Sequence, residues 1–191
     1  MKLKILEEII QNKNKKIEFS VITNLETGNS KIFLISNPID QDFADYEEQI
    51  KSFYKNKKIL VTGVTGFKGS WLCNWLLKLG AKVYGTGYNP NKNKKLFYSL
   101  NLQKKINLKL FDIRNFDQLN NLIKKSKPEI IFHLAAQPLV YDSYQRPMYT
   151  FDVNFRGTLN ILEAAKKCKS VKSIVCVTTD KVYENTNKNR N

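Results

Sequence analysis

The sequence predicts an α/β fold built on a doubly wound parallel sheet. Three observations predict it: short apolar runs alternate with amphipathic stretches from Lys57 onward, the first run ends in a glycine-rich turn, and polar residues follow the later runs. Strands that are apolar on both faces are typical of a parallel sheet buried between helices. Right-handed crossovers between such strands place helices on both faces of the sheet.

The expected elements of the sheet domain follow one another regularly. We expect strands at 58–62, 82–85, 106–110, 130–135 and 173–178, and helices at 68–79, 96–100, 116–126 and 148–168. One face of the third helix carries its apolar residues, which are Phe116, Leu119, Leu122 and Ile123. This spacing is helical. The sequence therefore predicts a sheet domain over residues 55–191.

The first part of the chain breaks this alternation. It predicts a helix at 3–11, strands at 17–23 and 31–36, and a charged helix at 43–54. The two strands flank a turn sequence around Gly28, which predicts a β-hairpin. Because an isolated hairpin is marginal in water, the helices have to cover it. We expect residues 1–54 to form a small α+β leader whose role the residues do not indicate.

Composition bounds the class of protein. Hydrophobic residues make up 42% of the 191 residues, enough for a core, and no apolar run approaches the roughly 20 residues of a membrane span. The amino-terminal stretch carries acidic residues and lacks a signal-peptide cleavage site. The three cysteines form no C-x-x-C pair. We therefore expect a cytoplasmic protein with reduced thiols, no membrane partner and no metal site.

The net charge of +15 raises the question of nucleic acid. A nucleic-acid-binding protein is expected to gather Arg and Lys with aromatic residues on one face. Here the lysines are spread along the whole chain and Arg is scarce. The charge predicts a solvated basic surface that favours anionic ligands. Nucleic-acid binding remains an alternative, but the prediction is that nucleic acid is not a partner.

The run I-L-V-T-G-V-T-G-F-K-G joins the first strand to the first helix of the sheet domain. Its glycines are three residues apart: Gly63 allows the chain to turn, Gly66 has no Cβ to keep a pyrophosphate from the backbone, and Gly69 allows close helix packing. The helix start offers unpaired N–H groups and a partial positive charge. The run predicts a Rossmann-like dinucleotide site. Ordinary turn chemistry is the alternative.

Polar residues follow the later strands. Asp112 could accept a hydrogen bond from an adenine amino group or serve as a loop or helix-capping residue. His133 is interpreted as a satisfied core residue rather than a base. Asn154, within the long helix, could hold a backbone bulge or face solvent. Thr179, Asp180 and Lys181 offer a hydroxyl, an acid and an ammonium at the end of the last strand, unless they form only a polar turn.

Together these motifs resemble one family. V-T-G-V-T-G-F-K-G-S-W, D-I-R, P-E-I-I-F-H-L-A-A-Q-P-L-V, N-F-R-G-T and V-T-T-D-K-V-Y-E-N, within about 57–185, closely resemble the NAD-dependent nucleotide-sugar 4,6-dehydratases, which are extended short-chain dehydrogenases/reductases. The F-K-G-S-W and T-D-K forms are similar to the CDP-glucose 4,6-dehydratase branch. The match covers only the amino-terminal part of that family, so the resemblance implies an incomplete sheet.

The resemblance implies roles for individual residues. NAD would be bound at its diphosphate by Gly63, Gly66, Phe67, Lys68 and Gly69, at its adenine by Asp112 and Ile113, and along its length by Ala135, Ala136 and Gln137. Catalysis would fall to Thr179, Asp180 and Lys181. The implied activity is that of a lyase in deoxysugar biosynthesis: oxidation at sugar C4, loss of water across C5–C6, and return of the hydride to C6. Asp180 would help expel the C6 hydroxyl and Lys181 would assist at C5.

Two departures from the family pattern leave alternatives open. Asn89 stands where the family usually has an Asp for the adenosine ribose, and lysines follow it, so NADP remains an alternative to NAD. The family's Tyr-x-x-x-Lys pair and its sugar-binding domain do not occur in the 191 residues. We therefore expect a fragment whose own activity is doubtful and that is part of a homodimer when full length. A related epimerase or reductase, or a dinucleotide-binding module without catalysis, is the alternative.

The leader has a resemblance of its own. The run F-S-V-I-T-N-L-E-T-G is faintly similar to the opening segment of xanthine-dehydrogenase accessory proteins. No cofactor-binding residues accompany it. The resemblance implies that the chain joins pieces of two unrelated families.

Overall fold

The computed structural model describes residues 19–23, 30–34, 41–88 and 95–178. Contacts divide the chain into two units, Met1–Phe53 and Tyr54–Asn191. In the first unit, β1 (Phe19–Thr23) pairs antiparallel with β2 (Ser30–Leu34), as the sequence predicts. Helix α2 (Gln41–Tyr54) follows and ends in the first residue of the second unit. The helix expected at 3–11 lies outside the described residues.

The second unit is built on a five-stranded parallel sheet, which confirms the predicted fold class. Its strands lie in the order β5-β4-β3-β6-β7 and all run in the same direction. Their bounds are β3 Lys58–Thr62, β4 Lys82–Gly87, β5 Asn107–Leu110, β6 Ile130–His133 and β7 Ser173–Cys176. The chain moves outward from β3 to β5 and then returns to β6 beside β3. Ligands bind at such a reversal, beyond the carboxyl ends of the strands.

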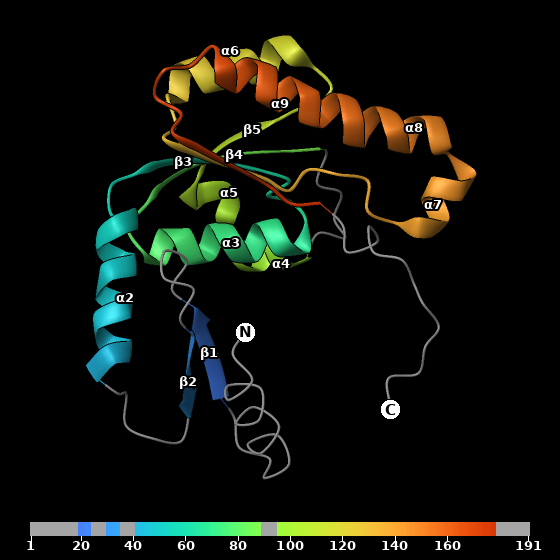
Figure 1. Cartoon of the computed structure of the whole chain (residues 1–191). Helices are drawn as coiled ribbons and strands as arrows, with labels where there is room; N and C mark the ends of the chain where they lie inside the picture. The colour runs from blue at the N-terminus through green and yellow to red at the C-terminus, as the bar shows by residue number, and fades with distance from the viewer. Residues whose placement is uncertain (1–18, 24–29, 35–40, 89–94, 179–191) are drawn as a thin grey trace, which may run out of the picture. The chain divides into compact units, whose positions relative to one another are not determined.

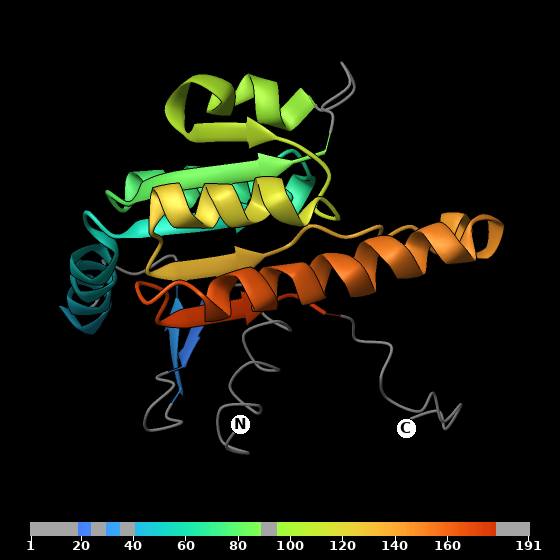
Figure 2. The same ribbon diagram turned by 90° about the horizontal axis from the view of Figure 1, so that it is seen from above.

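Helices cover both faces of this sheet (Figures 1 and 2). On one face lie α3 (Phe67–Lys78), α4 (Lys95–Ser99) and α5 (Leu102–Lys105), and on the other lie α6 (Phe116–Ser126) and α9 (Gly157–Lys166). Successive residues of β3 face opposite sides, so Ile59 and Val61 join the core under α3, whereas Leu60 joins the core under α6 and α9. Both cores hold the carboxyl ends of the strands in a fixed register.

The long helix expected at 148–168 is wrong in detail. It is preceded by α7 (Val140–Gln145), which the sequence did not suggest, and it begins with Pro147 in α8 (Pro147–Phe151). Proline is well tolerated in the first turn of a helix and disfavours helical geometry in the residue before it. A π-helical turn, η1 (Asp152–Arg156), then separates α8 from α9. Such turns occur often at functional sites.

Replacing Gly69 by alanine should destabilise the second unit by about 1–3 kcal/mol, the usual cost of overpacking. A Cβ at this position would lie 2.8 Å from the Gly63 carbonyl carbon and 3.0 Å from the Val64 Cα, and these backbone atoms cannot move aside cheaply. Urea unfolding followed by circular dichroism measures the change. Gly66→Ala is the matched control, because its Cβ would meet only the Gly63 carbonyl oxygen, at 3.3 Å. Equal midpoints for the two variants would contradict this packing.

Candidate functional site

The glycine turn after β3 lies at the point where the strand order reverses. Gly63 has a φ of +76°, in the left-handed region that favours glycine. The N–H groups of Gly63 and Val64 both donate to the Thr86 carbonyl, at 2.8 and 3.2 Å. A Cβ on Gly63 would lie 2.8 Å from the Ala135 nitrogen. The turn is therefore held between β4 and the loop after β6, with no room for a side chain.

The start of α3 is open by comparison. Gly66 is the N-cap of α3 and supplies no side-chain cap, and a Cβ there would contact only the Gly63 carbonyl oxygen. The Ser70 hydroxyl donates to the carbonyls of Val64 and Gly66, which closes the turn from within. The first N–H groups of a helix have no acceptor within it, and the helix dipole favours a negative charge there. Phe67 is 71% exposed beside them. This arrangement can receive a phosphate.

The loop after β6 faces this turn and is held from two sides. The N–H groups of Leu134 and Ala135 donate to the Thr62 hydroxyl oxygen, at 3.1 and 3.0 Å. The N–H of Gln137 donates to the Asn154 side-chain oxygen at 2.7 Å, and the Asn154 amide donates back to the Gln137 carbonyl at 3.1 Å. Asn154 lies within η1, and of the two roles that the sequence left open for it, its side chain takes neither in full: it bonds the loop backbone at Gln137.

The two alanines and the glutamine of this loop have different surroundings. Ala136 is exposed and Ala135 half-buried, so little side-chain bulk stands over the backbone here. The Gln137 side chain instead bonds within the protein, accepting from the Leu139 N–H and donating to the Thr150 hydroxyl. Gln137 therefore fixes the approach to α7 and α8 with its side chain and faces Asn154 with its backbone.

His133 is buried and fully hydrogen-bonded, as the sequence analysis expected. Its Nδ1 lies 2.7 Å from the Thr62 hydroxyl and its Nε2 lies 3.1 Å from the Thr158 hydroxyl. Only 3% of the residue is exposed, and this burial lowers the pKa of the imidazole to about 4. His133 is consequently neutral at pH 7 and has no free nitrogen to act as a base.

Asp112 lies after β5, and both its carboxylate oxygens accept from Arg114. These hydrogen bonds to the guanidinium lower the pKa of the Asp112 carboxyl. Arg114 also bonds Asp152 of η1 at 2.9 Å, and its guanidinium stacks over the Tyr149 ring. The N-cap of α6 is Asn115, whose side chain accepts from the Gln118 N–H. Asp112 is thus a loop residue that ties β5 to η1 through Arg114.

Ile113 contributes its side chain to the core and its backbone to the same junction. The residue is 6% exposed, and its side chain fills the space that a Cβ on Gly157 would need. The Asn160 amide donates to the carbonyls of Ile113 and Arg114. The backbone beside Asp112 is therefore fixed against α9, at the same edge of the sheet as the glycine turn.

Four residues singled out by the sequence, Asn89, Thr179, Asp180 and Lys181, lie outside the described residues. The direction of β7 is nevertheless described. It runs parallel to β6, and the Val177 N–H continues the pairing by donating to the His133 carbonyl at 3.0 Å. The chain therefore leaves β7 at the sheet edge that carries the glycine turn.

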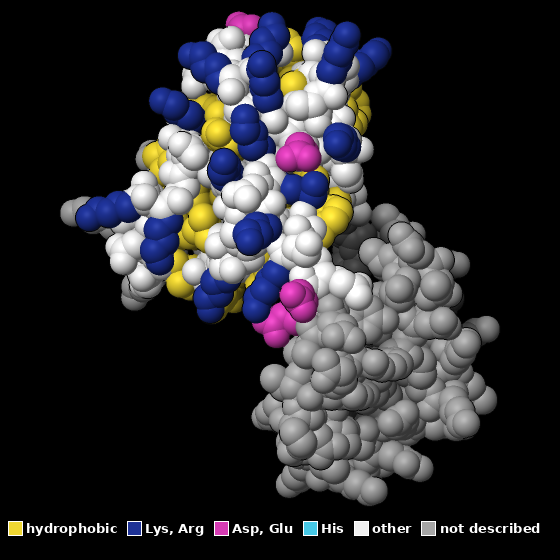
Figure 3. Space-filling model, turned by 90° about the vertical axis from the view of Figure 1, so that its left-hand side faces the viewer, with side chains coloured by type: hydrophobic (Ala, Val, Ile, Leu, Met, Phe, Trp, Pro, Cys, Tyr) yellow, Lys and Arg dark blue, Asp and Glu magenta, His cyan; other side chains and the backbone are white. Residues whose placement is uncertain are grey.

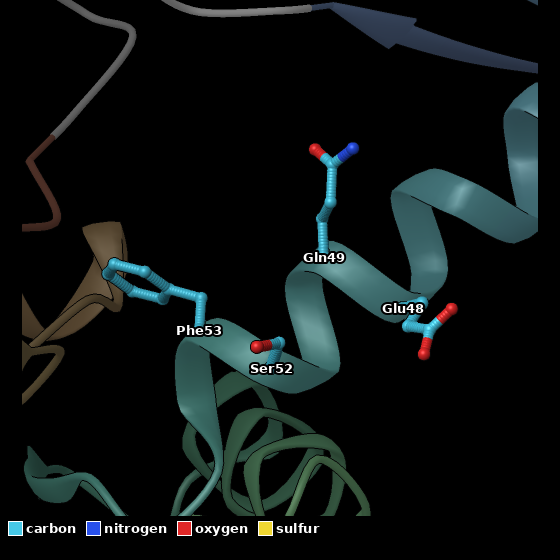
Figure 4. A pocket seen from close by; sticks show the side chains of 4 residues that line it. All are labelled: Glu48, Gln49, Ser52 and Phe53. Atoms are coloured by element: carbon cyan, nitrogen blue, oxygen red, sulfur yellow. The ribbon is translucent and has the colours of Figure 1, made fainter.

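Other sites offer less. A hollow is lined, among the described residues, by Glu48, Gln49, Ser52 and Phe53 of α2, and Figure 4 shows these side chains pointing in different directions. Burial raises the pKa of the Cys73 thiol to about 12, so it is not a nucleophile. Within the described ranges, no His, Cys, Asp and Glu residues gather in a group of three that could hold a metal. No helix in those ranges is both long and apolar enough to cross a membrane.

On the face drawn in Figure 3, the described basic side chains do not form one stripe. On the described part of the face in Figure 3, Lys and Arg are scattered among neutral and apolar side chains. Nucleic-acid recognition usually depends on a concentrated basic patch. The distribution is consistent with a generally basic surface.

A comparison with protein-family models assigns the chain to a family. The family model described as "GDP-mannose 4,6 dehydratase" matches residues 60–190, which include both loops of the site. The chain belongs to this family. The residues described above can therefore be compared with those of the GDP-mannose 4,6 dehydratase family.

Individual relatives agree with the family. A CDP-glucose 4,6-dehydratase of Salmonella typhimurium is 44% identical over 135 residues, covering 71% of this chain and 38% of its own length. A UDP-glucose 4-epimerase from Thermotoga maritima, solved with UDP-glucose, superposes with a TM-score of 0.55 at 30% identity, over 63% of this chain and 37% of the epimerase. A UDP-glucose 4-epimerase from Thermus thermophilus, in complex with NAD, superposes with a TM-score of 0.53 at 29% identity, over 60% of this chain and 35% of the epimerase. The chain thus spans well under half the length of these proteins.

The sequence analysis missed three residues that hold the site: Thr62, Arg114 and Thr158. Thr62 ends a strand that is otherwise apolar, and Arg114 follows Asp112 by two residues. Both positions are visible in the sequence. The bonds that link them to other segments reach far along the chain, from Arg114 to Asp152, from Thr62 to His133 and from Thr158 to His133. Local spacing therefore gives no signal for these bonds.

Lowering the pH should destabilise the second unit through His133. Its pKa falls from 6.5 in the unfolded chain to about 4 in the folded protein. The contribution of His133 to the free energy of unfolding is thus complete above pH 6.5. It is lost as the pH falls toward 4, by about 3 kcal/mol in total. Urea midpoints measured from pH 7 to pH 4 test this. The chain contains a single histidine. His133→Asn should therefore flatten the decline over this window, and an unchanged slope would contradict the assignment.

Proposed function

We propose that this chain binds NAD through the glycine turn and serves as the nucleotide-binding part of a nucleotide-sugar 4,6-dehydratase. The observation that carries the proposal is the open N-terminus of α3 at Gly66, placed where the strand order reverses between β3 and β6. A glycine cradle and unpaired N–H groups are suited to a diphosphate. Membership of the dehydratase family supports the same assignment.

Particular residues would hold each part of NAD. Gly63, Gly66, Phe67, Lys68 and Gly69 surround the start of α3 and would hold the diphosphate. Asp112 and Ile113 would face adenine, with the Asp112 carboxylate shared between adenine and Arg114. Asn89 would bond the ribose, and Ala135, Ala136 and Gln137 would lie along the cofactor. NAD, when bound, supplies a reversible hydride acceptor.

The proposed substrate is CDP-glucose. The similarity to the Salmonella CDP-glucose 4,6-dehydratase supports this choice, and so does the T-D-K sequence of residues 179–181. In this proposal Thr179 bonds a sugar hydroxyl, Asp180 donates a proton to the leaving C6 hydroxyl and Lys181 assists removal of the C5 proton. The end of β7 at the sheet edge beside the glycine turn supports this placement.

We also propose a homodimer for the protein in cells, with cytoplasmic location. Exposed apolar side chains gather on α7, α8, η1 and α9, and large patches of this kind usually mark an interface. Seven of them are Tyr141, Tyr144, Met148, Phe151, Phe155, Leu159 and Leu162. The Phe151 and Phe155 rings stack within this surface, with their centroids 5.1 Å apart.

Two alternatives remain distinct from dehydration. The epimerases among the structural relatives are compatible with a nucleotide-sugar epimerase or reductase on the same scaffold. A module that binds NAD without turnover requires only the glycine turn. Asp180 separates the first alternative from the proposal, because expulsion of a hydroxyl needs an acid at that place.

Gly66→Ala should weaken NAD binding by at least about tenfold while leaving the fold intact, because a methyl group would occupy the space for the diphosphate. Calorimetric titration of the chain with NAD and NADP measures the change and also shows which nucleotide is preferred. Gly80→Ala, at a left-handed turn beside Lys55 and away from the site, is the control for a general effect of losing a glycine. Equal NAD affinity for Gly66→Ala and the unaltered chain would overturn the diphosphate site.

Dehydration can be tested in a chimera that joins this chain to the carboxyl-terminal part of the Salmonella relative. The chimera should convert CDP-glucose to a CDP-4-keto-6-deoxy sugar, and Asp180→Asn should slow water loss by about 100-fold or more, a typical effect of losing an acid catalyst. Asp142→Asn is a matched control, because Asp142 pairs with Arg146 on the exposed α7. Product carrying only an inverted C4 would overturn the dehydratase assignment in favour of epimerisation. Sedimentation of the chimera tests the dimer.

A further inference from the structure

Three polar residues form a row across the sheet at its carboxyl edge. Thr62 pairs in register with Thr86 on β4 and with His133 on β6. All three residues are buried, with exposed fractions of 0%, 1% and 3%. Two residues earlier on each strand, Leu60, Tyr84 and Ile131 belong to the core under α6 and α9, so the row continues that face of the sheet. Burial of polar groups costs free energy unless they are hydrogen-bonded; Thr62 and His133 bond each other, whereas the buried Thr86 hydroxyl has no hydrogen-bond partner among the described residues.

The bonds of Thr62 dictate the tautomer of His133. The Thr62 hydroxyl oxygen accepts from the Ala135 N–H and shares the Leu134 N–H with the Thr62 carbonyl, which leaves its hydrogen to be donated. The acceptor within reach of that hydrogen is His133 Nδ1, 2.7 Å away. Nδ1 then carries no proton, and the hydrogen of the neutral ring is on Nε2.

The hydrogen bonds of Thr158 indicate the same tautomer of His133. The Thr158 hydroxyl donates to the Asn154 carbonyl at 2.7 Å, so its oxygen is free to accept from His133 Nε2–H at 3.1 Å. The bonds thus run in one direction from Thr62 through His133 and Thr158 to Asn154. Asn154 lies in the π-helical turn η1, and its side chain holds the backbone of Gln137.

We propose that His133 is a positioning residue whose Nε2–H tautomer, through Thr158 and Asn154, sets the place of the loop 134–137 against the glycine turn. This inference rests on the proposed function for its consequence, because that loop flanks the proposed NAD site. In this role His133 acts at the edge of the sheet that is proposed to bind the cofactor, and its imidazole neither gains nor loses a proton. A satisfied core histidine would also have a fixed tautomer, so the link through Thr158 and Asn154 to Gln137 is what distinguishes the positioning role.

The single histidine makes the tautomer directly measurable. In the full chain labelled with nitrogen-15, the imidazole signals should show a proton on Nε2, slow to exchange with solvent, and none on Nδ1 at pH 7. A proton on Nδ1, or a mixture of the two tautomers, would overturn the proposal. This measurement does not depend on NAD.

Variants at Thr158 test the link to the loop. Thr158→Val keeps the shape of the side chain but removes the hydroxyl, whereas Thr158→Ser keeps the hydroxyl. Hydrogen exchange at the Gln137 amide should accelerate by about fivefold in Thr158→Val, the effect of one lost hydrogen bond. It should stay near the original rate in Thr158→Ser. Ser126→Ala is the matched control, because the Ser126 hydroxyl also bonds a helical carbonyl, that of Leu122.

The outcomes distinguish positioning from stability alone. Positioning predicts that Thr158→Val weakens NAD binding more than Ser126→Ala does at equal loss of melting temperature, and that Thr158→Ser restores the affinity. Equal exchange at Gln137 in the valine and serine variants would overturn the positioning role. If the unaltered chain bound no NAD, the proposed function would fail, and the imidazole tautomer together with exchange at Gln137 would still test the positioning role.

Discussion

The close approach of two backbone segments organises the site. The turn at Gly63 lies against the backbone of Leu134 and Ala135 so tightly that a single Cβ would collide with it. This contact brings the end of β3 and the end of β6 together where the strand order reverses. Because both loops emerge from strands buried in two cores, the start of α3 is fixed in the open and can meet an anionic ligand.

Hydrogen bonds complete what this contact begins. Thr62 holds the loop after β6 from below, and Asn154 holds it from the helical side. The π-helical turn has a physical reason to persist here, because it places Asn154 within reach of Gln137 while Thr158 bonds the Asn154 carbonyl. Arg114 makes a second junction between the β5 loop and the same turn. The turn η1 is thus bound to both neighbouring loops of the candidate site.

Much of the fold could be predicted because its signals are local. The strand at 58–62 and the helix at 116–126 match the structure residue for residue, since an apolar run and a 3.6-residue period are properties of contiguous sequence. The glycine turn could be predicted for the same reason. The helix at 148–168 could be predicted as a segment, but its π-helical turn could not. Nothing in N-F-R-G-T distinguishes backbone hydrogen bonds that span five residues from those that span four. Asn89 and residues 179–181 remain predictions.

The sequence by itself determined the parallel sheet, the glycine turn and the family resemblance, because periodicity and motif spacing are written along the chain. Only the tertiary structure decided the partners: Arg114 with Asp152, His133 with Thr62 and Thr158, and Gln137 with Asn154. These pairs are between 17 and 71 residues apart along the chain. A polar residue shows which bonds it can make, but its neighbours in space depend on how strands and helices pack. Folding alone therefore determines whether His133 is a base or a satisfied link.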